Sequence, residues 1–80
     1  MVKLKNIKRI DSRVAECDIY PEDSKESGHI VVDYIENSLI RYTLPKGYEW
    51  YTNHVSHAQW VLVEMMNENN PATERLVMWY

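Results

Sequence analysis

Two short segments that alternate between apolar and polar residues constrain the fold of this chain more than any other feature. "HIVVDYI" (29–35) and "LIRYTL" (39–44) are rich in β-branched and aromatic residues, and only Glu36, Asn37 and Ser38 separate them. This pattern is typical of a β-hairpin. A three-residue loop sets Asp33 opposite Arg41 and puts Asn37 or Ser38 in the left-handed conformation. It also creates one apolar face, which comprises Ile30, Val32, Tyr34, Ile40, Tyr42 and Leu44.

One segment has helical periodicity, and it follows the hairpin. "NHVSHAQWVLVEMMNEN" (53–69) carries apolar residues at helical spacing, namely Val55, Ala58, Val61, Leu62, Met65 and Met66. Thr52 or Asn53 is suited to be the N-cap, and Pro71 marks the limit at the far end. Because this stripe is the only long one, we expect the helix to cover the apolar face of the hairpin. Trp60 lies off the stripe and is expected at the margin of the core.

Three further segments complete the predicted sheet. "VAECDIY" (14–20) alternates, so that Cys17 is expected to be a buried, unreactive core residue. "KLKNIKRID" (3–11) suits a strand or a helix, and its surroundings favour a first strand. "TERLVMWY" (73–80) reads as a last strand, beside the first or second strand. The prediction is a single α+β domain, 1–80, in which a small antiparallel sheet of about four to five strands, in the order β-β-β-β-α-β, carries one helix across one face.

Charge and cysteine content bound the function. The net charge is −3, but five basic residues and one acidic residue give residues 1–13 a charge of +4, and four basic and eleven acidic residues give residues 14–80 a charge of −7. The acidic body argues against broad nucleic-acid binding. With a single cysteine, no signal peptide and no long apolar run, the chain is expected in the cytoplasm and not in a membrane.

The aromatic-rich stretch "YEWYTNHVSHAQW" (48–60) is the first candidate site. It either plugs the end of the core, since the chain has no phenylalanine, or forms a surface for a protein partner or a second copy of the chain. If the last strand lies at the sheet edge, its exposed backbone also invites a second chain. The interface candidates are Tyr48, Trp50, Tyr51, Trp79 and Tyr80.

Two further sites are alternatives. His54 and His57 lie in the first turn of the predicted helix, where the helix dipole favours the neutral imidazole that a metal or small ligand needs. Two histidines do not complete a zinc site, so no cofactor is expected. Glu22 and Asp23 are paired acids in a polar loop and are expected to be solvated. A basic arm could contact nucleic acid or protect an edge strand; it comprises Lys3, Lys5, Lys8, Arg9 and Arg13.

The segment "SGHIVVDYIENSLIRYTLPKGYEWYTNHVSHAQW" (27–60) resembles small uncharacterised proteins of Gram-positive bacteria that are carried as accessory open reading frames on integrative mobile elements. The resemblance implies a bacterial cytoplasmic setting and an auxiliary role, and it carries over no catalytic residues. We therefore expect a non-enzymatic protein-interaction or self-association module. A small nucleic-acid-binding or regulatory protein is the first alternative, and a metal or small-ligand site is the second.

Overall fold

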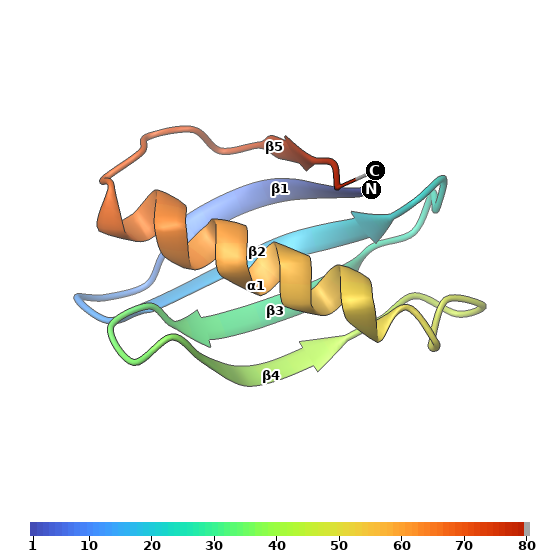
Figure 1. Cartoon of the computed structure of the whole chain (residues 1–80), viewed down its shortest axis with the longest axis horizontal. Helices are drawn as coiled ribbons and strands as arrows, with labels where there is room; N and C mark the ends of the chain where they lie inside the picture. The colour runs from blue at the N-terminus through green and yellow to red at the C-terminus, as the bar shows by residue number, and fades with distance from the viewer. Residues whose placement is uncertain (80) are drawn as a thin grey trace.

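The computed structural model describes residues 1–79 and shows a five-stranded antiparallel sheet with one helix lying across one face (Figure 1). Along the chain the elements are β1 (Val2–Arg9), β2 (Val14–Pro21), β3 (Gly28–Asp33), β4 (Ser38–Thr43), α1 (Thr52–Asn67) and β5 (Arg75–Val77). In the sheet the order is β4-β3-β2-β1-β5, so that β5 returns beside β1 and forms an edge. The predicted fold class and order of elements are confirmed.

The core lies between α1 and the helix-covered face of the sheet. All six predicted stripe residues of α1 are buried, and Val63 is buried with them. On the sheet, Ala15, Cys17 and Ile19 are fully buried, as the alternation in β2 predicts. The intervening side chains of each strand point to the other face, which no helix covers. We call it the open face of the sheet.

The register of the β3–β4 hairpin differs from the prediction. Asp33 pairs with Ser38 and Val31 pairs with Arg41, so the loop runs from Tyr34 to Asn37 and a β-bulge follows in β4. Asn37 takes the left-handed conformation with φ of 54°, as predicted. The predicted pair of Asp33 with Arg41 is wrong, and two residues that were placed on the covered face, Ile40 and Tyr42, are about half exposed on the edge strand.

The Asp33 carboxylate supplies the physical reason for this register. It accepts hydrogen bonds from the backbone N–H groups of Ile35 and Glu36, both at 3.0 Å, so the loop begins at Tyr34, two residues earlier than predicted. Arg13 then donates to Asp33 Oδ2 at 2.9 Å from Nε and lies 2.8 Å from it through Nη2. The backbone N–H of Glu36 and then Arg13 lower the pKa of Asp33.

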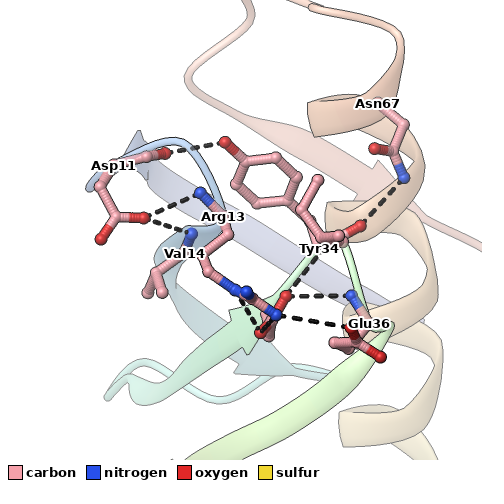
Figure 2. A network of polar contacts seen from close by, with 8 residues as sticks. Asp11, Arg13, Val14, Tyr34, Glu36 and Asn67 are labelled. Carbon is pink, nitrogen blue, oxygen red and sulfur yellow. Dashed lines mark hydrogen bonds and ion pairs between the residues drawn. The ribbon is translucent and has the colours of Figure 1, made fainter.

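Tyr34 joins three elements at this end of the molecule (Figure 2). Its hydroxyl donates to the carbonyl of Asp11 and accepts from Arg9 Nη1, both at 2.7 Å. Its backbone N–H donates to Arg13, and Asn67 of α1 donates to its carbonyl at 3.2 Å. Tyr34 therefore ties the β1–β2 turn and the end of α1 to β3.

The ends of α1 and β5 also differ from the prediction. The N-cap residue is Tyr51, with no side-chain cap hydrogen bond, so neither Thr52 nor Asn53 has that role. The backbone N–H of Tyr51 instead donates to Tyr48 in a preceding turn, which brings the chain directly into the helix. β5 contains only Arg75–Val77 and is shorter than the predicted last strand.

Candidate functional site

A chain of aromatic rings runs from the loop before α1 to the C-terminal segment. Tyr48 and Tyr51 meet edge to face at 5.2 Å between centroids, and Tyr51 lies 4.8 Å from His54. Trp79 packs between the two histidines: it is 4.8 Å from His54, edge to face, and stacks on His57 at 4.0 Å with an interplanar angle of 7°. The structure thus brings together three predicted interface residues and both predicted ligand histidines.

Of the other two predicted interface residues, Trp50 is not part of this ring chain. Trp50 is 87% exposed, so it does not plug the end of the core. The loop around it is held instead by the Tyr48 hydroxyl, which donates to Asp23 at 2.9 Å, and by Glu49, which accepts from Gly47 N–H at 2.9 Å. Tyr80 lies outside the described residues.

A groove of about 420 Å³ opens next to the ring chain, between α1 and β5. We call it the α1–β5 groove. His57 and Trp79 form one part of its lining, and Trp60, Leu76 and Met78 form the exposed apolar part. The sequence indicated Trp60 only as a core-margin residue, because it lies off the apolar stripe. The sequence carries no signal that brings Leu76 and Met78 beside it, since that depends on β5 lying next to β1.

The histidines have partners other than a metal ion. His54 Nε2 lies 2.7 Å from Glu22 Oε2, and only 13% of its side chain is exposed. The Trp79 ring occupies the space between His54 and His57. Across residues 1–79, no three side chains of the histidine, cysteine and acidic types converge on a possible metal position. Glu22 is half-buried and also pairs with the Met1 ammonium, so the prediction that it is solvated is wrong.

The five residues of the predicted basic arm separate in space. Arg9 lies on the helix side, where it donates to the Met66 carbonyl at 2.9 Å and so places a cation at the C-terminal end of α1. Arg13 pairs with Asp33 and Glu36. Lys3, Lys5 and Lys8 point to the open face, opposite residues of β2. β1 lies between β2 and β5, so the interpretation that the arm protects an edge strand is wrong.

The open face carries a polar cluster that sequence reasoning missed. His29 lies between two carboxylates of β2, with Nδ1 at 2.9 Å from Asp18 and Nε2 at 2.8 Å from Glu16. Burial lowers the pKa of His29, but the hydrogen bonds to Asp18 and Glu16 outweigh it, so the net shift is upward. Asn6 donates to Asp18 at 2.8 Å, and this bond, followed by that of His29, lowers the pKa of Asp18.

Cys17 is fully buried, and burial raises the pKa of its thiol to about 12, with the nearby Asp18 and Glu16 carboxylates adding to the shift. A thiolate is therefore disfavoured at neutral pH; the burial confirms that Cys17 is a core residue, and its lack of reactivity stays a prediction.

No family model matches this chain, and comparisons with curated proteins and with solved structures find no significant similarity. The resemblance to proteins of mobile elements therefore stays a prediction. The fold defines the chain as a small α+β domain built on an antiparallel sheet. Within residues 1–79 no helix is long and apolar enough to span a membrane.

Proposed function

We propose that this protein is a non-enzymatic interaction module that associates with a second copy of itself through the α1–β5 groove. The observation that carries this proposal is the exposure of three large apolar residues around β5: Trp60 is 61% exposed on the helix side of the groove, Met78 is 59% exposed, and Leu76, which pairs with Lys3 and points to the open face, is 52% exposed. Single exposed apolar residues are common on soluble proteins, but a group of them around a groove marks an interaction site.

The position of β5 favours a second chain as the occupant. β5 and β4 are the two edges of the sheet, and an edge strand can pair with a strand of another chain. β4 contains a β-bulge, which discourages such pairing, whereas the three residue pairs between β5 and β1 are in regular register. β5 is therefore the better template for an added strand.

A two-fold arrangement suits the composition of the groove. In an antiparallel pair of β5 strands the same surface is used twice: a residue on the two-fold axis, such as Leu76 in the middle of β5, meets its own counterpart, and the other residues face different residues of the second copy. Glu64 and Arg75 also line the groove, and a two-fold axis can bring the acidic group of one copy to the basic group of the other. A standard interface buries about 800 Å² per partner. That area is about one sixth of the 4983 Å² of accessible surface of this chain.

Sedimentation equilibrium over a range of concentrations tests the proposal. We expect a concentration-dependent dimer that the double variant Trp60→Ala, Leu76→Glu converts to a monomer without changing the circular dichroism spectrum. Trp50→Ala is the matched control, because Trp50 is an exposed tryptophan that does not line the groove. A wild-type protein that stays monomeric at high micromolar concentration would refute self-association. If Trp50→Ala dissociates the dimer and the double variant does not, the interface is the loop around Trp50 and not the groove.

We also propose a cytoplasmic setting for this module. The support is the single cysteine, which is buried in the core and has no second cysteine in the chain to pair with. Fractionation of the native host followed by immunodetection checks this assignment, and recovery of the protein in the culture medium would contradict it.

A further inference from the structure

A second hollow, of about 440 Å³, lies on the open face at the end where β1 begins and β2 ends. It gathers three lysines around one tyrosine ring, and we call it the basic hollow. Lys3 and Lys5 belong to β1, and Tyr20 is the cross-strand partner of Lys3 in β2. Lys25 comes from the loop between β2 and β3. The chain as a whole has a net charge of −3, so this gathering of lysines runs against its overall charge.

The carboxylates at the basic hollow are held by other groups. Glu22 pairs with the Met1 ammonium and with His54, and Asp23 accepts a hydrogen bond from the Tyr48 hydroxyl at 2.9 Å. These contacts hold both acidic side chains in place, and the Met1 ammonium offsets the negative charge of Glu22. Both acidic residues of the basic hollow thus have partners within the protein, which accounts for their presence beside the lysines.

The lysines have no comparable partners. Within the described part of the chain, Lys3 and Lys25 form no ion pair. Lys5 makes one long contact, 3.9 Å, to the exposed side chain of Glu74, and its ammonium lies 5.5 Å from the centroid of the Tyr20 ring. Three ammonium groups therefore surround the hollow with their hydrogen-bonding capacity largely unused.

We propose that the basic hollow binds the phosphate group of a small molecule. Lysine ammonium groups are compact charges on flexible stems and can converge on a phosphate dianion. The volume of the hollow falls in the range of small-molecule sites, and the Tyr20 ring offers a face for a planar group attached to the phosphate. The residues of this site are separate from those of the α1–β5 groove, so the inference does not depend on self-association.

Titration of the ¹⁵N-labelled protein with pyrophosphate and with adenosine monophosphate (AMP), followed by NMR, tests the inference. We expect saturable amide shifts at residues 3–5 and 20–25. The double variant Lys3→Gln, Lys25→Gln should bind about tenfold more weakly, which corresponds to about 1.4 kcal/mol. Lys46→Gln is the control for net charge, because Lys46 is an exposed lysine of the β4–α1 loop that does not line the hollow, and it should bind almost as the wild type does.

The two probes also separate the possible sources of the phosphate. Binding of pyrophosphate alone would assign a phosphate compound without a ring, and tighter binding of AMP that Tyr20→Leu abolishes would assign a nucleotide. The inference is overturned if neither probe gives saturable shifts at millimolar concentration, or if Lys46→Gln weakens binding as much as the double variant. It is also overturned in favour of nucleic acid if a single-stranded oligonucleotide binds far more tightly than AMP and Lys8→Gln removes that binding.

Discussion

Replacement of Tyr34 by phenylalanine removes a single oxygen atom from the junction of three elements. The Tyr34 hydroxyl has two partners at 2.7 Å, the carbonyl of Asp11 and the guanidinium of Arg9, and the residue is only 4% exposed. Water therefore replaces the lost bonds poorly. Arg9 keeps its bond to the Met66 carbonyl, so we expect a loss of about 1–2 kcal/mol in the free energy of unfolding. For a chain of this length the whole free energy of unfolding is roughly 4–12 kcal/mol, so the expected loss is a large fraction of it.

Urea denaturation followed by circular dichroism measures this loss. The urea concentration at the transition midpoint should fall, while the slope of the unfolding free energy against urea concentration stays unchanged. The melting temperature should fall by roughly 5–15 °C. Tyr42→Phe is the matched control, because Tyr42 is 44% exposed and its hydroxyl makes no hydrogen bond within residues 1–79. We expect the control to change the free energy by less than about 0.5 kcal/mol. Equal effects of the two substitutions would refute the role given to Tyr34.

Three other predictions concern the sheet. Because the folded-state pKa of His29 is raised above its ordinary value of 6.5, the stability that His29 adds is fully present below that value and is lost as the pH rises through the folded pKa. The difference in unfolding free energy between wild type and His29→Gln should therefore be largest below pH 6.5 and shrink as the pH rises above that value. A constant difference would contradict the pairing of His29 with the two β2 carboxylates. Cys17 should react with a thiol reagent only after unfolding, since its pKa of about 12 and its burial protect it, and rapid labelling of the native protein would disprove this. Gly28→Ala should lower the free energy of unfolding by about 1–3 kcal/mol in the same urea assay, because a β-carbon there would lie 2.1 Å from the backbone oxygen of Thr43. An unchanged free energy would show that β4 can move away from the added methyl group.

β2 and α1 were predictable because each buries one side of a repeating pattern of apolar residues. The period of two in β2 and the helical period in α1 assign Cys17 and Leu62 to the core without reference to any distant residue. The hairpin register was not predictable in this way. Asp33 forms hydrogen bonds with the backbone of its own loop and with Arg13. The pattern of apolar residues predicts neither of these polar contacts.

The candidate sites show the same division. Aromatic content singled out Tyr48, Tyr51 and Trp79, which the structure joins into one chain of rings with the two histidines. Trp60 and Leu76 are distant in sequence, and they line one groove because β5 passes over to β1 after the helix. The loop from β2 to β3 likewise decides that Lys25 approaches the lysines of β1.

By itself the sequence determined the α+β class, the order of the elements and the buried faces of β2 and α1, because the periodicity of apolar residues along one segment indicates which of its side chains are buried. Tertiary structure alone decided the hairpin register, the split of the basic arm between two faces, and the meeting of β5 with α1. The split of the basic arm and the position of β5 depend on contacts between residues that are far apart in the chain. The hairpin register depends both on the bonds of Asp33 to its own loop and on its distant partner Arg13.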